Sequence, residues 1–110
     1  MTKILICGSS GKMGKAVFEA VERTEGVEVL CGVDAFSKGE LSFTEYKCFE
    51  DVKEIPDVVV DFSNPVNLDS MYDFCIKNNV PAVICTTGFS PEQVEKINEL
   101  SKFVPVFYSG

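Results

Sequence analysis

Three glycines, each separated by two residues, occupy positions 8, 11 and 14 in the pattern G-x-x-G-x-x-G. Gly8 permits a tight turn, Gly11 has no Cβ to keep a pyrophosphate from the backbone, and Gly14 lets a helix pack closely on a sheet. Free N–H groups and the positive dipole end of a helix favour an anion at such a turn. The pattern predicts a dinucleotide phosphate site. The alternative is a tight strand-to-helix turn that binds no ligand.

The residues on either side of the glycines predict the elements that would position them. The apolar run 4–7 indicates a strand, and the residues after it repeat at helical spacing: Met13, Ala16, Val17, Ala20 and Val21. Asp34 ends the next apolar run, 27–33, where the ribose hydroxyls of a dinucleotide would lie. With strand, helix and acid in this order, we favour nucleotide binding over an empty turn.

Two further polar segments follow apolar runs. Residues 61–63, Asp-Phe-Ser, can border a ribose and nicotinamide, or they can simply end a strand and cap the next helix. Residues 85–88, Cys-Thr-Thr-Gly, can orient a carboxamide through hydroxyl and N–H groups, or they form an ordinary turn. Lys12 can reach a phosphate, although a lysine in a first helical turn is more often only a solvated charge. Both interpretations of each segment stay open at this point.

The rest of the chain alternates between strand and helix patterns. We expect one helix capped by Asn64 with Pro65 at its first position, and another with Ser90 and Gln93 as a capping box. Apolar residues mark their buried faces: Leu68, Met71, Tyr72, Cys75 and Ile76 in the first, and Val94, Ile97 and Leu100 in the second. Further strands are expected at 47–49, 58–60, 81–85 and 104–107, with a loop at 35–46 and a helical turn at 50–54.

Strands that alternate with single helices predict a parallel sheet with right-handed crossovers. The fold class is therefore α/β, a Rossmann-like doubly wound parallel sheet with strand order 3-2-1-4-5-6, in a single domain over residues 1–110. In such a sheet a ligand binds at the carboxyl ends of the strands, where the order reverses between the first and fourth strands. The loops that end there are 8–14, 34, 62–65 and 85–88, so four separate segments are expected to converge on one crevice.

Composition narrows the function. The 110 residues carry a net charge of −7 and no basic stripe, which argues against nucleic-acid binding. The chain has no histidine, which excludes histidine bases, ligands and triads. Its five cysteines form no C-x-x-C pair, so we expect no zinc site and reduced, buried thiols in a cytoplasmic protein. No apolar run is long enough for a membrane span or a signal-peptide core.

Taken together, three segments resemble the N-terminal part of the 4-hydroxy-tetrahydrodipicolinate reductase family, also called dihydrodipicolinate reductases. They are the glycine loop at 8–14, the Val-Asp-Phe-Ser run at 60–63 with Pro65, and the Thr-Thr-Gly-Phe run at 86–89. The resemblance covers essentially the whole chain. This combination, in this order and spacing, is far more specific than a glycine loop alone.

The resemblance implies hydride transfer from NADH or NADPH to a cyclic dicarboxylate in the diaminopimelate route to lysine. It also implies a second domain for substrate binding and for assembly into a homotetramer, and no catalytic residue in this chain. The cofactor-binding residues that we expect are Gly8, Ser10, Gly11, Lys12, Met13 and Gly14 at the pyrophosphate, Asp34 at the adenine ribose, and Phe62, Ser63, Thr86, Thr87 and Gly88 at the nicotinamide.

The chain departs from the family pattern in two ways. Cys85 stands where family members often have glycine, which leaves the nicotinamide contacts there less certain. The histidine–lysine catalytic stretch of the family is absent, so we expect a truncated piece that binds cofactor without turnover. The alternatives are a stand-alone dinucleotide-binding module that senses or regulates, and the cofactor domain of another Rossmann dehydrogenase.

Asp34 also predicts which dinucleotide binds. Its carboxylate can accept hydrogen bonds from both ribose hydroxyls of NADH, whereas the 2′-phosphate of NADPH would bring like charges together. Its neighbours are Ala35 and Phe36 rather than an arginine, and Lys38 is the only nearby cation. We therefore expect NADH to be preferred, with NADPH as a second, weaker ligand.

Overall fold

Six parallel strands form one sheet in the order β3-β2-β1-β4-β5-β6, which confirms the predicted topology. The computed structural model describes residues 1–109. Its strands are β1 Thr2–Cys7, β2 Val27–Val33, β3 Thr44–Tyr46, β4 Val58–Asp61, β5 Ala82–Ile84 and β6 Val106–Tyr108. Its helices are α1 Lys12–Glu22, α2 Leu68–Asn78 and α3 Pro91–Leu100, with short 3-10 turns η1 Phe49–Asp51 and η2 Pro65–Asn67.

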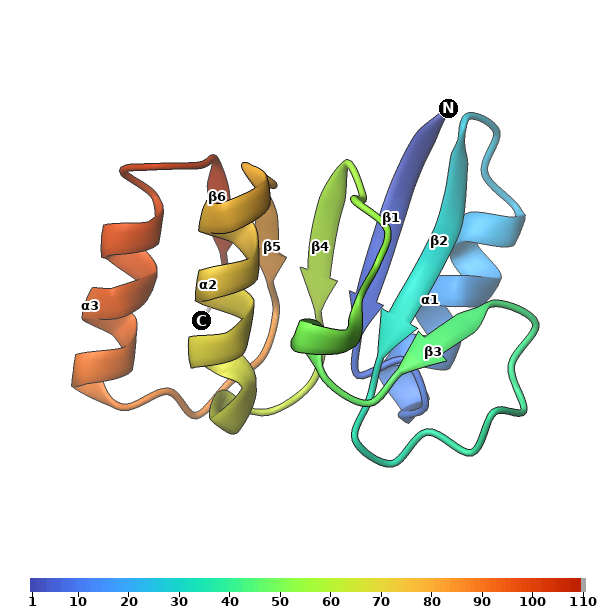
Figure 1. Ribbon diagram of the computed structural model, residues 1–110, viewed down its shortest axis with the longest axis horizontal. Helices are drawn as coiled ribbons and strands as arrows, with labels where there is room; N and C mark the ends of the chain where they lie inside the picture. Colours follow the sequence, from blue (N-terminus) through green and yellow to red (C-terminus); the bar gives the residue numbers. More distant parts are fainter. Residues whose placement is uncertain (110) are drawn as a thin grey trace.

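The helices cover both faces of the sheet. In Figure 1, α1 lies behind β1 and β2, and α2 and α3 lie in front of the other half. This follows from handedness, because the chain winds outward from β1 to β3 and then in the opposite direction from β4 to β6, with right-handed crossovers throughout. All carboxyl ends therefore meet at one edge of the sheet, the lower edge in Figure 1, and the winding reverses between β1 and β4.

The core lies between the sheet and the front helices. Leu5, Val59, Met71, Ile84 and Leu100 are each fully buried. Full burial of an aliphatic side chain of this size contributes about 1.5–3 kcal/mol. The core also contains Cys7, Cys31 and Cys75, and all five cysteines are free thiols. The near-continuous hydrophobicity of β1 and β4 is typical of strands with both faces covered.

The buried face of α1 differs from the periodicity in the sequence. Gly14 is buried and Val17, Phe18 and Val21 are half-buried, whereas Met13, Ala16 and Ala20 are exposed. Gly14 lies directly against the glycine loop, where a Cβ would be 2.3 Å from the Gly8 carbonyl oxygen. Phe18 packs against Phe43, with ring centroids 5.1 Å apart.

The third strand was predicted at 47–49, and this was wrong. β3 runs over Thr44–Tyr46, inside the segment expected to be a loop, and pairs with Cys31–Val33. Threonine and tyrosine suit a half-buried strand, while Phe49 belongs to η1 and buries its ring against Phe74, at 5.2 Å between centroids. The helical turn expected at 50–54 is thus η1, which begins earlier and is shorter.

The predicted caps are present. The Asn64 side chain accepts a hydrogen bond from the Val66 N–H, and Ser90 and Gln93 form a reciprocal capping box. The first of these opens the 3-10 turn η2, and α2 itself begins only at Leu68. Asn79 ends α2 in the left-handed region at φ 55°. Over residues 1–109, none of the helices combines the length and apolar character needed to span a bilayer.

Candidate functional site

The glycine loop joins three strands at the point where the winding reverses. The Gly8 N–H donates to the Val33 carbonyl at 2.8 Å, which ties the loop to β2. Gly8 has φ 89°, and a Cβ there would lie 2.5 Å from the carbonyl oxygen of Phe62. Only glycine fits such a conformation and such an approach. The loops that follow β1 and β4 are therefore in direct backbone contact.

Gly14 and Gly11 have opposite surroundings. A Cβ on Gly14 would lie 2.3 Å from the Gly8 carbonyl oxygen, so the start of α1 rests on the loop backbone. Gly11 has ordinary extended angles, φ −80° and ψ 173°, and a Cβ there would meet only the Gly8 carbonyl oxygen, at 3.4 Å. The fold therefore requires glycine at position 14, but folding alone does not require it at position 11. The space beside Gly11 is open, and a side chain added there would occupy it.

The amino end of α1 is not capped by a side chain. Gly11 is its N-cap residue and makes no side-chain hydrogen bond, and no acidic residue stands in the first turn. By contrast, Asn64 caps η2, the 3-10 turn that leads into α2, and Ser90 caps α3. The first N–H groups of a helix lack partners within the helix. Those of α1 are available to an anion.

Asp34 stands at the carboxyl end of β2 and organises the loop beside it. Its carboxylate accepts hydrogen bonds from the backbone N–H groups of Ser10, at 2.9 Å, and Phe36, at 2.8 Å. One oxygen serves each donor, and each retains a further lone pair. The side chain is half-buried and borders the cleft described below. Asp34 thus links the glycine loop to the segment after β2.

Glu45 was missed from the sequence, where it fell within an expected loop. It lies in β3 opposite Gly32, and its carboxylate accepts hydrogen bonds from the hydroxyls of Ser9, Ser10 and Ser37. Gly32 makes room for this arrangement, because a Cβ there would lie 2.4 Å from Ser9 Oγ. The signal for β3 in the sequence is the pair Thr44 and Tyr46, and a strand predicted there would have placed Glu45 beside the loop.

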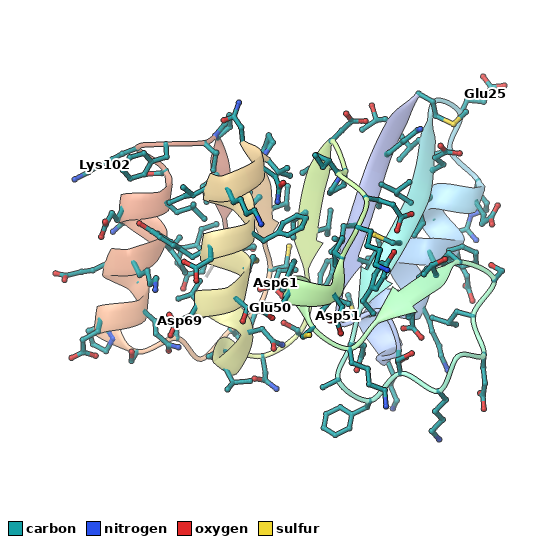
Figure 2. The ribbon with its side chains drawn as sticks, viewed as in Figure 1. Glu25, Glu50, Asp51, Asp61, Asp69 and Lys102 are labelled. Carbon is teal, nitrogen blue, oxygen red and sulfur yellow. The ribbon has the colours of Figure 1, made fainter. Side chains whose placement is uncertain are left out.

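A buried polar cluster joins the ends of β1, β4 and β5. Asp61 is 2% exposed, and its Oδ1 accepts hydrogen bonds from the Ser63 hydroxyl, at 2.5 Å, and the Ser63 N–H, at 3.1 Å. Figure 2 shows Asp61 near the carboxyl edge of the sheet and Glu25 at the opposite edge. The Cys7 thiol lies 3.3 Å from Ser63 Oγ, and burial beside the Asp61 carboxylate raises the pKa of that thiol, so it donates as S–H.

Thr86 belongs to the same cluster. Its Oγ1 accepts a hydrogen bond from the Ser63 N–H at 3.0 Å and lies 3.4 Å from the Asp61 carbonyl oxygen. The residue is 4% exposed, so its hydroxyl faces the protein interior. Thr87 and Gly88 are exposed, and Gly88 has φ 86°. Contact of residues 86–88 with a nicotinamide stays a prediction.

A cleft of about 330 Å³ lies between the glycine loop, the end of β2 and the loop after β4. Its lining includes five of the residues that the sequence nominated: Gly8, Gly11, Asp34, Phe62 and Ser63. Ser10 lines an adjoining cavity. Lys12 and Met13 are exposed in the first turn of α1, and neither they, nor Gly14, nor residues 86–88 line this cleft. In residues 1–109, no group of acidic, cysteine or histidine side chains is placed to hold a metal ion.

A family model and several curated proteins are similar to this chain over essentially its whole length. The family model described as "Dihydrodipicolinate reductase, N-terminus" matches residues 2–110. A 4-hydroxy-tetrahydrodipicolinate reductase of Clostridium novyi (strain NT) is 46% identical over the whole chain, and that of Clostridium tetani (strain Massachusetts / E88) is 36% identical. The chain spans 44% and 43% of those two proteins.

Solved structures show the same fold. A dipicolinate-bound dihydrodipicolinate reductase from Paenisporosarcina sp. TG-14 matches 92% of this chain, with 29% identity, a TM-score of 0.76 and 43% of its own length covered. A myo-inositol 2-dehydrogenase from Lactobacillus plantarum matches 98% of this chain with a TM-score of 0.79 and 36% of its own length covered. At 17% identity the second likeness concerns the fold alone.

Proposed function

We propose that this chain, which belongs to the family of dihydrodipicolinate reductase N-terminal domains, binds NADH or NADPH for the reaction of a complete reductase. The reaction is hydride transfer to a cyclic dicarboxylate in the diaminopimelate route to lysine. The chain spans less than half the length of the curated relatives that it matches. The activity, the dicarboxylate substrate, the homotetramer and the cytoplasmic location are therefore proposed for the whole protein.

The observation that carries the proposal is the uncapped amino end of α1 beside the open side of Gly11. A pyrophosphate needs N–H donors and a backbone without Cβ atoms in its way. Both are present between β1 and β4, where the direction of winding reverses. The cleft at this point extends to Asp34 and Phe62. The donor set is backbone rather than lysine or arginine, which suits a protein with a net charge of −7.

The residues of the site then have separate roles in binding the cofactor. The cofactor, when bound, supplies the hydride. The loop from Gly8 to Gly14 holds its diphosphate, and Asp34 accepts hydrogen bonds from ribose hydroxyls with the lone pairs left by Ser10 and Phe36. Phe62 and Ser63 border the cleft beyond the loop, and the Asp61–Ser63–Thr86 cluster fixes their backbone. Residues 87 and 88 follow on toward the nicotinamide.

The 110 residues alone are expected to hold the cofactor without turnover. Reduction of an anionic substrate also needs cations for its carboxylates and a proton donor. The chain contains no histidine, and Asp34 and Glu45 are the charged side chains directly bonded to the glycine loop. Mixing the purified chain with NADH and 4-hydroxy-tetrahydrodipicolinate tests this, with the absorbance of reduced nicotinamide as the readout.

We expect no oxidation of NADH above background in that assay, and we expect it with a complete reductase as the matched control. Turnover by the chain near that of the control would overturn the division of tasks. A chain that fails to bind either reduced dinucleotide at millimolar concentration would overturn the proposed function itself.

A further inference from the structure

We propose that Glu45 is a second residue that selects NADH over NADPH, acting by occupying the donors that a 2′-phosphate would need. The inference rests on the proposed dinucleotide function. It assigns a specificity role to a side chain that does not border the main cleft. The carboxylate holds three serine hydroxyls at once, those of Ser9, Ser10 and Ser37.

Ser10 connects this carboxylate to the ribose end of the site. Its backbone N–H donates to Asp34 Oδ2 at 2.9 Å, and its hydroxyl donates to Glu45 Oε2 at 2.8 Å. Two carboxylates are therefore bonded to one residue. Since an acid at the end of the second strand meets the 2′-hydroxyl of the ribose, Ser10 links Glu45 to the residue expected at the 2′ position.

A cavity of about 240 Å³ opens on this side of the glycine loop, lined among others by Ser10, Lys15, Lys38 and Glu45. Its volume and its two lysines would suit a phosphate group. The serine hydroxyls and the backbone N–H groups beside Asp34, however, are already engaged. The Ser10 and Ser37 hydroxyls donate to Glu45, and the N–H groups of Ser10 and Phe36 donate to Asp34.

A 2′-phosphate would thus meet the carboxylates of Asp34 and Glu45, with the exposed Glu40 beside them. Its donors would be the ammonium groups of Lys15 and Lys38 rather than the serine hydroxyls, which Glu45 already holds. Like charges disfavour binding, and the serine hydroxyls would have to leave Glu45 before they could bind the phosphate. The 2′-hydroxyl of NADH is neutral and escapes both penalties. Glu45 therefore works against NADPH more than it works for NADH, a device that specificity commonly uses.

The test measures dissociation constants of NADH and NADPH for the wild-type chain, Glu45→Gln and Glu40→Gln. Glutamine keeps the length of the side chain and an acceptor oxygen for the serines, and it removes the charge. Glu40 lines the same cavity but is exposed, so its variant controls for a general loss of one negative charge. Glu45→Thr, a smaller side chain suited to a strand, serves if Glu45→Gln fails to fold.

We expect Glu45→Gln to shift the NADPH-to-NADH affinity ratio toward NADPH by about tenfold or more, and Glu40→Gln to shift it less than about threefold. Adding Ser37→Ala to Glu45→Gln should reverse part of the gain, because it removes one released donor. An unchanged ratio in Glu45→Gln, or an equal shift in Glu40→Gln, would overturn the role of Glu45. Absence of binding of both dinucleotides to the wild type would instead overturn the proposed function.

Discussion

The backbone N–H of Ser63 donates a hydrogen bond to the side-chain oxygen of Thr86 at 3.0 Å. This bond joins the loop after β4 to the end of β5, and Ser63 also bonds to Asp61 at the end of β4. Gly8 rests against the same loop, since a Cβ there would lie 2.5 Å from the Phe62 carbonyl oxygen. The border of the cleft is therefore held in part by Asp61 and Thr86, which are buried and are not among the residues that line it.

Replacing Thr86 by valine should destabilise the protein. The change keeps the shape but removes the acceptor for a half-buried N–H, which retains only its bond to Asp61. We expect a loss of about 1–2 kcal/mol in the free energy of unfolding, measured with urea. Thr87→Val is the matched control, because Thr87 is exposed, and it should cost less than about 0.5 kcal/mol. Equal effects of the two variants would contradict the role assigned to the cluster.

Stability should fall in alkaline solution because of the buried thiols. Burial raises the pKa of Cys31 and of Cys75 from 9.0 to about 12, and raises that of Cys7 as well. The unfolded chain then releases protons above pH 9 that the folded chain retains until about pH 12. The stabilisation is thus complete below pH 9 and is lost as the pH rises from 9 to 12, by up to about 1.4 kcal/mol per pH unit for each thiol.

Measuring the free energy of unfolding with urea at roughly pH 7, 9 and 10.5 checks this expectation. Cys31→Ala should lose less free energy of unfolding between about pH 9 and pH 10.5 than the wild type does, which is a smaller slope against pH, whatever the variant costs in stability at pH 7. Cys48→Ala should change the slope less, because Cys48 is not in the buried core. A slope that is the same in wild type and Cys31→Ala would show that the alkaline loss has another source.

Asp34 should set part of the choice between the two dinucleotides. Removing its carboxylate in Asp34→Ala takes away the acceptor for the ribose hydroxyls and a charge that repels a 2′-phosphate. We expect the preference for NADH to fall by about tenfold, equivalent to about 1.4 kcal/mol. Titrations of NADH and NADPH into wild type and variant give the ratio.

Glu25→Ala is a control for that titration, since Glu25 is an acid at the opposite edge of the sheet (Figure 2). Its ratio should match the wild type. Asp34→Asn keeps the size of the side chain and an acceptor oxygen, so it separates the charge from the hydrogen bonds to Ser10 and Phe36. Tighter binding of NADPH than NADH by the wild type would mean that Asp34 does not govern the choice.

The sequence sufficed for the topology because its signals were local. The apolar run before Gly8, the caps at Asn64 and Ser90 and the β-branched run before Asp61 each indicate one element. Handedness restricts the sheet to a few orders, and the glycine loop followed by Asp34 favours the dinucleotide-binding one. The glycine positions were equally informative. Gly8 and Gly14 each stand where a Cβ would collide with backbone.

The parts that were missed depend on contacts between distant segments. β3 is three residues long, and its position is fixed by pairing with Cys31–Val33 rather than by its own pattern. Glu45 was missed with it, because its partners in the glycine loop are 35 and 36 residues away. The inward orientation of Thr86 likewise depends on Ser63, 23 residues earlier. The periodic pattern of apolar residues along the sequence contains no information on such pairings.

The central claim, that the glycine loop holds a nicotinamide dinucleotide, is tested most directly by NADH binding to the wild-type chain and to Gly11→Ala. The fold tolerates alanine here, since position 11 has φ −80° and a Cβ would meet only the Gly8 carbonyl oxygen, at 3.4 Å. The free energy of unfolding should be unchanged or higher by about 0.4–1 kcal/mol, which thermal unfolding would show. The added methyl should nevertheless obstruct a pyrophosphate. We predict saturable NADH binding by the wild type and an affinity at least about tenfold weaker in a fully folded Gly11→Ala. Equal affinity of the two proteins, or no binding by the wild type, would contradict the account.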